Sequence, residues 1–325
     1  MRLLVLLGAL LLVALGLSVA FGETGLSASQ YVAAFRDPSS PAAEILFGLR
    51  APRACAAALV GAALGLAGAV MQGLLRNPLA EPGVLGVSAW SGCAAALSIA
   101  FGLGAAPGAV EAAALAGALG AGAMIALLAA RFREPETLIL FGVALAALGG
   151  ALTALVFNLS PSPVTLAEIN AWLQGSVANR DWSDLGAALV PMIPGAALCA
   201  YSARGLRLLT LGEETAALSG LRMARLRVAA VAGAALLTGA SVAMAGIIGF
   251  VGLAAPHLVR GWAADDPART LAPSAIAGAI LLTLADLIAR VIPSEQELRL
   301  GVVTALFGAP LFALVAWRAA RSWRA

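Results

Sequence analysis

The chain has 325 residues, of which 61% are hydrophobic and only 11% are charged, and its formal net charge is +3. Soluble domains carry about 25% charged residues, so this composition excludes an ordinary soluble protein. The 36 glycines and the many alanines favour close helix packing in lipid. The composition therefore predicts an all-α integral membrane protein that crosses the membrane many times.

Apolar runs of roughly 20 residues, the length that crosses a bilayer core, predict about ten membrane-spanning helices. The predicted spans are 3–21, 46–75, 84–103, 109–130, 138–159, 185–203, 228–247, 249–262, 271–292 and 300–318. The first run is longer than the roughly 7–15 apolar residues of a signal peptide. We therefore interpret it as a span, with a removed leader as the alternative. The eighth run is short and holds glycines and a proline, so it is predicted to be a broken span.

Two polar segments between the spans, 23–45 and 160–184, are predicted to be loops. The second is expected to hold a short amphipathic helix at the membrane surface, with Trp172 and Trp182 at headgroup depth. Cys55, Cys93 and Cys199 all lie in apolar runs, and we interpret them as small buried hydrophobes. No metal or cofactor role is expected for them.

Arginine supplies every one of the 20 basic residues, and its distribution between the two sides of the membrane predicts the orientation. With ten crossings, 14 arginines fall on the side that holds both termini and 6 fall on the other. The positive-inside rule then places both termini, and the loop 205–227, in the cytoplasm.

Several kinds of catalytic or binding site are excluded by residue type. Because the chain has no lysine, it cannot contain the lysine of an ATP-binding P-loop. His257 is the single histidine and has no cluster of cysteines or carboxylates near it in sequence, so no metal site is expected. Enzymatic catalysis by this chain and a bound cofactor are not expected.

Asp286 is the one clear carboxylate inside a predicted span, and Arg290 follows it four residues later. On a helix this spacing places the two side chains on the same face, so a local ion pair is the simpler interpretation. A proton relay is the alternative, but it would need several such groups along a path.

The segment "LGEETAALSGLRMARLR", 211–227, is a polar island in an apolar chain. Glu213 and Glu214 are typical of a first helical turn, and Gly220 is a typical stop. The pattern predicts a short surface helix that docks in a groove of another protein, with an ordinary solvated loop as the alternative.

Four stretches resemble the FecCD-type permeases of ABC importers, a family that imports iron-siderophores, haem and cobalamin. They are the island, which is similar to the coupling loop, together with 49–88, 244–260 and 284–315. The resemblance implies one permease domain over 1–325, with type II importer architecture and a coupling segment at about 205–227. It implies that Glu213, Glu214, Ala217 and Gly220 seat on a separate ATPase subunit.

The same resemblance implies the assembly: a permease homodimer around a central path, two ATP-binding cassette subunits and a periplasmic substrate-binding protein. A heterodimer of permeases is the open alternative. The surroundings are the lipid of the bacterial inner membrane, and no nucleic-acid partner is expected.

The resemblance also implies a gate that closes the path on the cytoplasmic side. Asn77 and Leu79, in the turn "RNPLAEPG", are expected at the dimer axis. Glu136 and Thr137, at the start of the fifth span, are expected in the same gate, although "REPETLIL" departs from the family pattern there. A plain inter-helix turn is the alternative for the first pair.

Three arginines on the predicted outer side, Arg50, Arg53 and Arg290, resemble the residues that dock the binding protein. Snorkelling to lipid phosphate is the alternative, and Arg290 has the further alternative of pairing with Asp286. The path is expected to be lined by small and apolar positions, namely Thr153, Asn158, Gly301, Thr304 and Ala305.

The cargo is expected to be a ferric siderophore or haem, with cobalamin as the alternative. A secondary transporter or channel that works without ATPases is the competing class of protein.

Overall fold

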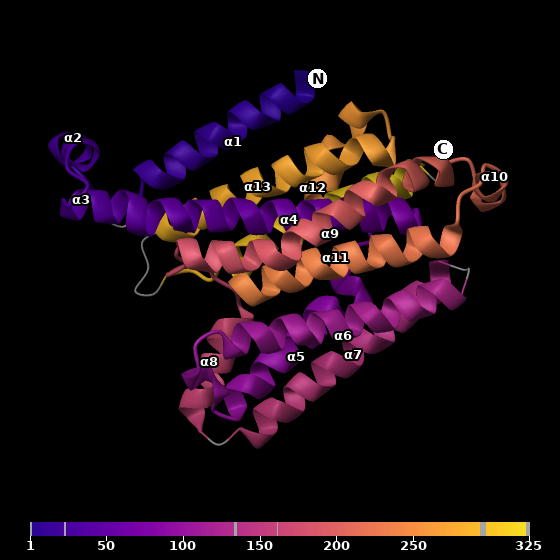
Figure 1. The fold of residues 1–325 in the computed structure, drawn as a ribbon, viewed down its shortest axis with the longest axis horizontal. Helices are drawn as coiled ribbons and strands as arrows, with labels where there is room; N and C mark the ends of the chain where they lie inside the picture. The colour runs from indigo at the N-terminus through magenta and orange to yellow at the C-terminus, as the bar shows by residue number, and fades with distance from the viewer. Residues whose placement is uncertain (1, 23, 133–134, 161, 293–296, 323–325) are drawn as a thin grey trace.

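The computed structural model describes residues 2–22, 24–132, 135–160, 162–292 and 297–322, and within them the chain is helical without any β-strand. Figure 1 shows the long helices side by side in one elongated bundle. The main helices are α1 Arg2–Ala20, α2 Ala28–Arg36, α3 Pro41–Ala43, α4 Ala51–Leu75, α5 Val87–Ala100, α6 Ala109–Arg131, α7 Pro135–Leu159, α8 Pro163–Leu173, α9 Trp182–Leu209, α10 Glu213–Leu218, α11 Met223–Ala245, α12 Val251–Arg260, α13 Pro267–Val291 and α14 Leu300–Ser322. A π-helix at Glu44–Arg50 leads into α4, and 3-10 turns lie at Pro82–Leu85 (η2), Leu103–Ala105 and Gly261–Ala263.

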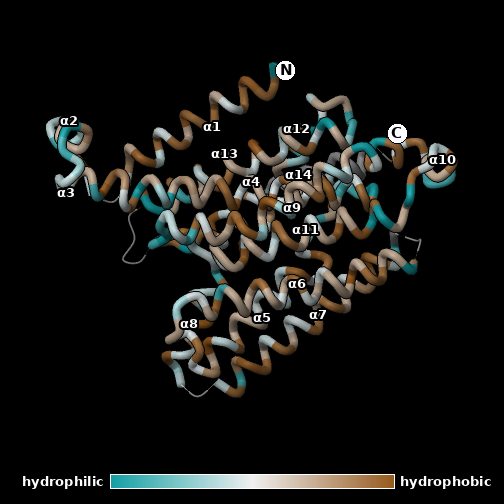
Figure 2. The backbone as a smooth tube through the Cα atoms, in the orientation of Figure 1, coloured by the Kyte–Doolittle hydropathy of each residue, from teal (hydrophilic) through white to brown (hydrophobic). Residues whose placement is uncertain are grey.

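Each of the ten predicted spans corresponds to a helix, and this part of the prediction is confirmed. Among the described residues, seven helices are long and apolar enough to cross a membrane, namely α1, α4 with its leading turns, α6, α7, α9, α11 and α13. Shorter apolar helices occupy Val87–Ala100 and Leu300–Pro310. The eighth predicted span is the 10-residue α12, preceded by irregular backbone, as its glycines and proline predict. Figure 2 shows mostly hydrophobic residues along the long helices and more hydrophilic residues near their ends.

Two boundaries differ from the sequence prediction. The segment 23–45 is not a simple loop, because Ser27 and Gln30 form a reciprocal capping box that starts α2. The third span is shorter than predicted, because Gly86 has φ +80 and separates η2 from α5. The remaining 14 residues of α5 reach only about 21 Å at 1.5 Å per residue, less than a bilayer core.

The centre of the bundle is formed by α4, α11 and α13, which are mostly buried, whereas α1 and α7 are mostly exposed. Close approach depends on glycine in α4. A Cβ atom at Gly68 would clash with the carbonyl oxygen of Gly252, and one at Gly61 would clash with that of Gly278. Small residues at these positions let helix backbones touch, which is the usual way that helices associate where lipid offers no hydrophobic drive.

The segment after α7 forms the expected short helix, α8, which begins at Ser162 with a side-chain cap on Thr165. Trp172 on this helix packs against core clusters of the protein. Trp182 begins α9, is 54% exposed, and donates from its indole nitrogen to the carbonyl of Phe47 at 3.1 Å. The two tryptophans therefore differ in surroundings.

Candidate functional site

The polar island folds as the short helix α10, which stands off the end of the bundle in Figure 1. It is bounded by Gly212 with φ +94 and Gly220 with φ +84, backbone conformations that favour glycine. The predicted start at Glu213 and stop at Gly220 both agree with the structure. Ala216 is fully buried against the bundle, whereas Leu218 is 90% exposed. The helix therefore has one anchored face and one free face.

The two glutamates at the start of α10 have different surroundings. Glu213 accepts from Arg227 at 2.9 and 3.0 Å, and Arg227 is 5% exposed and also donates to the carbonyl of Phe132 at 3.0 Å. This contact ties α10 to the first turns of α11 and to the end of α6. Glu214 and Ala217 are exposed. Of the four predicted coupling residues, Glu213 holds the helix, Gly220 turns the chain, and Glu214 and Ala217 face outward.

The predicted gate turn follows α4 at the same end of the bundle. Arg76 adopts the left-handed conformation with φ +47 and ends α4. The side-chain oxygen of Asn77 accepts from the amide of Leu79 at 2.9 Å, which fixes the turn locally. Leu79 is 38% exposed, so this apolar side chain projects from the turn.

The second predicted half of the gate is at the start of α7. Glu136 is exposed and Thr137 is half-buried. The turn η2 packs on α7, where a Cβ at Gly142 would meet the backbone of Leu85 at 2.8 Å. Between the gate turn and η2 lies Glu81, and burial raises the pKa of its carboxyl. The turn and α7 are thus neighbouring elements.

The predicted path residues lie on two separate helices. Gly301 and Ala305 line a cavity of about 630 Å³ between α14, the end of α8 and the irregular segment before α12. In the wall of this cavity, the amide of Gly301 donates to the carbonyl of Gln174 at 3.0 Å. The close packing requires glycine at this position, because a Cβ atom would clash with the same carbonyl oxygen. Thr304 is 7% exposed and its hydroxyl donates to Gly301 at 3.1 Å, so it faces the protein interior.

The other two predicted path residues are on α7, which packs on α5, α6 and η2, whereas α14 packs on α12 and α13. Thr153 is half-buried and donates to Gly149 at 2.9 Å, and Asn158 is exposed and donates to Ala154 at 2.9 Å. Both helices expose large apolar side chains, among them Leu140, Leu155, Leu159, Leu306 and Phe307. One copy of the chain does not bring the two halves of the predicted path together.

The three predicted docking arginines gather at the opposite end of the bundle, beside the end of α1. Arg50 is 6% exposed and donates to the carbonyls of Val19 at 3.3 Å and Ala20 at 2.8 Å, and also to that of Thr24. Cationic side chains commonly satisfy the last carbonyls of a helix in this way. Arg50 is therefore a cap for the C-terminal end of α1.

Arg53 and Arg290 share one buried carboxylate. Asp286 is 1% exposed and pairs with Arg53 at 2.8 Å and with Arg290 at 3.1 Å. Arg53 also pairs with Glu297, and Arg290 donates to the backbone and hydroxyl of Ser18 at 3.2 and 2.6 Å. The predicted pair between Asp286 and Arg290 is confirmed, but sequence reasoning missed Arg53 as its second partner, because 233 residues separate it from Asp286.

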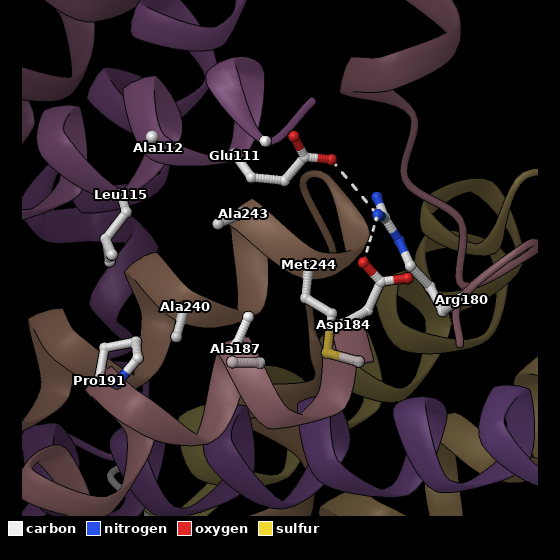
Figure 3. Close-up of a pocket in the computed structure, with 12 residues that line it drawn as sticks. Glu111, Ala112, Leu115, Arg180, Asp184, Ala187, Pro191, Ala240, Ala243 and Met244 are labelled. Carbon is white, nitrogen blue, oxygen red and sulfur yellow. Dashed lines mark hydrogen bonds and ion pairs between the residues drawn. The ribbon is translucent and has the colours of Figure 1, made fainter. Parts of the chain in front are cut away.

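A further cavity of about 310 Å³ opens between α6, α9 and α11 and is drawn in Figure 3. Its mouth carries Arg180 between two carboxylates, Glu111 at 3.3 Å and Asp184 at 3.7 Å, and its floor is formed by small and apolar side chains such as Pro191 and Met244. None of the residues that the sequence predicts as functional lines this cavity.

Comparison with known proteins gives consistent matches over nearly the whole chain. The model of the FecCD transport family matches residues 10–318. The vitamin B12 import system permease protein BtuC of Escherichia coli O157:H7 is 40% identical over 324 residues, covering 98% of this chain and 96% of that protein. The protein of the same name from Shigella flexneri is 39% identical with the same coverage.

A solved structure is also similar, described as an inward-facing conformation of a metal-chelate type ABC transporter. It superposes with a TM-score of 0.86 at 33% sequence identity, covering 98% of this chain and 99% of that one.

Proposed function

Since this chain belongs to the FecCD transport family and is a membrane permease subunit of an ABC importer, we propose that its cargo is a bulky metal chelate. Cobalamin is the first candidate, because relatives 40% identical over 98% of the chain are vitamin B12 permeases. A ferric siderophore or haem, which the sequence alone placed first, is the second candidate and agrees with the metal-chelate description of the similar structure.

The proposed working unit contains two copies of the chain. The observation that supports it is the separation of α7 from α14, each with predicted path residues and a broad exposed apolar face. A second copy would cover those faces and close the path between the two chains. Small and apolar linings such as Gly301 and Ala305 would let a large ligand slide without tight binding.

Energy would enter through α10. Its free face carries Glu214, Ala217 and Leu218, and its anchored face is fixed by Ala216 and by the contact of Glu213 with Arg227. Movement of a docked ATPase would therefore pass to α11 and α6 as a rigid-body shift. The proposal places α10, the gate turn and both termini in the cytoplasm, and the arginine cluster at the periplasmic side, where a substrate-binding protein docks.

The cargo is tested by isolating the substrate-binding protein that co-purifies with this permease and identifying its bound ligand by mass spectrometry. Uptake of radiolabelled cyanocobalamin and of a ferric siderophore is then measured in proteoliposomes that hold the permease and its ATPase. Saturable, ATP-dependent uptake of cobalamin alone supports the first candidate. Uptake of an iron chelate alone supports the second, and uptake that persists without the ATPase would contradict the importer.

Coupling is tested with Gly220→Pro and Glu214→Arg in the same proteoliposomes. Both variants should assemble in the membrane but lose ATP-driven uptake, because the first removes a backbone conformation with φ +84 and the second reverses a charge on the free face. Glu168→Gln, an exposed carboxylate on α8, is the matched control. Full uptake by both variants would remove the coupling role of α10.

A further inference from the structure

A basic pocket of about 360 Å³ lies beside α10, between the last turns of α9 and the first turn of α11. Arg204 comes from α9, and Arg222 and Arg225 come from the start of α11. The turn that links α10 to α11 forms the remaining wall through Ser219, Gly220 and Leu221. The pocket is therefore built from the anchoring parts of the proposed coupling segment.

The positive charge of this basic pocket is not balanced by the described part of the chain. All three arginines are exposed, and none of them forms an ion pair with a described carboxylate. Neighbouring arginines differ in this respect, since Arg227 is paired with Glu213 and Arg207 with Asp266 at 2.9 Å.

The position of these charges at a helix start adds to the imbalance. The helix α11 has Arg222 at its N-cap, without a side-chain cap and without an acidic residue in the first turn. The N-terminus of a helix carries a partial positive charge, so cations there are unfavourable and an anion is stabilised. Arg222 and Arg225 thus add two positive charges at the end of a 23-residue helix that is already positive.

The surroundings of the basic pocket indicate a lipid as the source of the anion. Tyr201 lies one turn before Arg204 on α9 and is 65% exposed, which is typical of an aromatic residue at the membrane interface. Earlier in α9, two to three turns before Tyr201, Val190 and Ile193 are 74% and 63% exposed, which fits a helix face in contact with acyl chains. Leu208 adds an apolar wall within the pocket.

We propose that this basic pocket binds the phosphate of an anionic phospholipid, such as phosphatidylglycerol or cardiolipin, at the junction of α9, α10 and α11. Basic pockets between membrane helices commonly bind such headgroups. Bound lipid would hold the turn at Gly220 and thereby the position of α10. This consequence rests on the proposed coupling role, whereas lipid binding itself does not.

Binding is tested on the purified permease–ATPase complex by native mass spectrometry with added phosphatidylglycerol, cardiolipin or phosphatidylcholine of matched acyl chains. The anionic lipids should be retained and phosphatidylcholine should not. The double variant Arg204→Gln/Arg225→Gln should weaken retention by about 25-fold, from about fivefold per arginine near a membrane surface. Arg76→Gln/Arg131→Gln removes two exposed arginines outside the pocket and should leave retention unchanged.

Four results would overturn the proposal. Equal retention of phosphatidylcholine would show that the pocket does not select a negative charge. An equal loss in the control pair would show a general surface effect. Loss of the ATPase from the Arg204→Gln/Arg225→Gln complex, with lipid retention unchanged, would assign the pocket to an acidic patch of the ATPase. Competition by inorganic phosphate without any lipid retention would assign it to a free anion.

The effect on coupling is measured separately, as ATP-driven uptake in liposomes with and without anionic lipid. Uptake by the wild type should rise with anionic lipid, and uptake by the Arg204→Gln/Arg225→Gln variant should not. Because retention is read without transport, failure of the importer function would leave the binding result intact, and failure of binding would leave the importer function intact.

Discussion

Removal of the Asp286 carboxylate is expected to destabilise the permease strongly. Asp286 is 1% exposed and lies between two arginines, at 2.8 Å from Arg53 and 3.1 Å from Arg290. Asp286→Ala leaves the buried Arg290 without a described carboxylate partner and leaves Arg53 with Glu297 alone. Removing one partner of a buried ion pair costs about 3–5 kcal/mol, because the other charge stays buried without compensation. At about 2–4 °C per kcal/mol, the melting temperature should fall by about 10 °C.

The chain carries its own reporter for this measurement. Cys93 and Cys199 are 1% and 0% exposed, whereas Cys55 is only half-buried, unlike the sequence expectation. With Cys55→Ser in every variant, a thiol-reactive fluorogenic dye should label the other two thiols only when the bundle opens. The melting curve in detergent is recorded for the wild type, for Asp286→Ala, and for Glu214→Ala as an exposed-carboxylate control. The control should melt with the wild type.

A double variant separates loss of charge balance from loss of packing. Asp286→Leu/Arg290→Met removes one anion and one cation, and Arg53 still pairs with Glu297. Replacing both partners of a buried pair by apolar groups is far milder than removing one. The double variant should therefore melt well above Asp286→Ala. If the single variant melts within about 2 °C of the wild type, or the double variant is no better, the charge-balance reasoning is refuted.

Three further outcomes are expected. Gly68→Ala should lower the melting temperature and the yield of folded protein, because its Cβ would clash with the Gly252 backbone; Gly8→Ala, which meets no atom within 4 Å, is the control. Glu81→Gln should raise the melting temperature more at about pH 8 than at about pH 4, because a raised carboxyl pKa makes stability fall as pH rises above the unfolded value; an equal shift at both pH values would contradict this. Arg50→Gln should lower the melting temperature by uncapping α1, and a slower, salt-dependent association of the binding protein at unchanged stability would instead favour docking.

Local chemistry explains why much of the architecture could be predicted from sequence. A run of apolar residues must become a helix in lipid, because every backbone group has to find its partner within the segment. The positions of the long helices follow from this requirement alone. The short helix α10 was also predictable, since acids at its start and Gly220 at its end are local signals.

Other features were decided by contacts between segments that are distant in sequence. The shortening of α5 depends on Gly86, whose backbone packs directly against α7. The pairing of Glu213 with Arg227 joins residues 14 apart across a turn, and no helical spacing rule predicts it.

The arginine cluster shows the same division. The sequence predicted that Arg50, Arg53 and Arg290 lie at the same end of the spans. It also predicted the ion pair between Asp286 and Arg290, because residues four apart lie on the same face of one helix. Only the tertiary structure shows that Arg53 pairs with Asp286. It also shows that Arg50 and Arg290 donate hydrogen bonds to carbonyls at the C-terminal end of α1. Local periodicity sets which residues share a helix face, whereas the choice of a buried charge's partner depends on which helices pack together, and that is a property of the whole bundle.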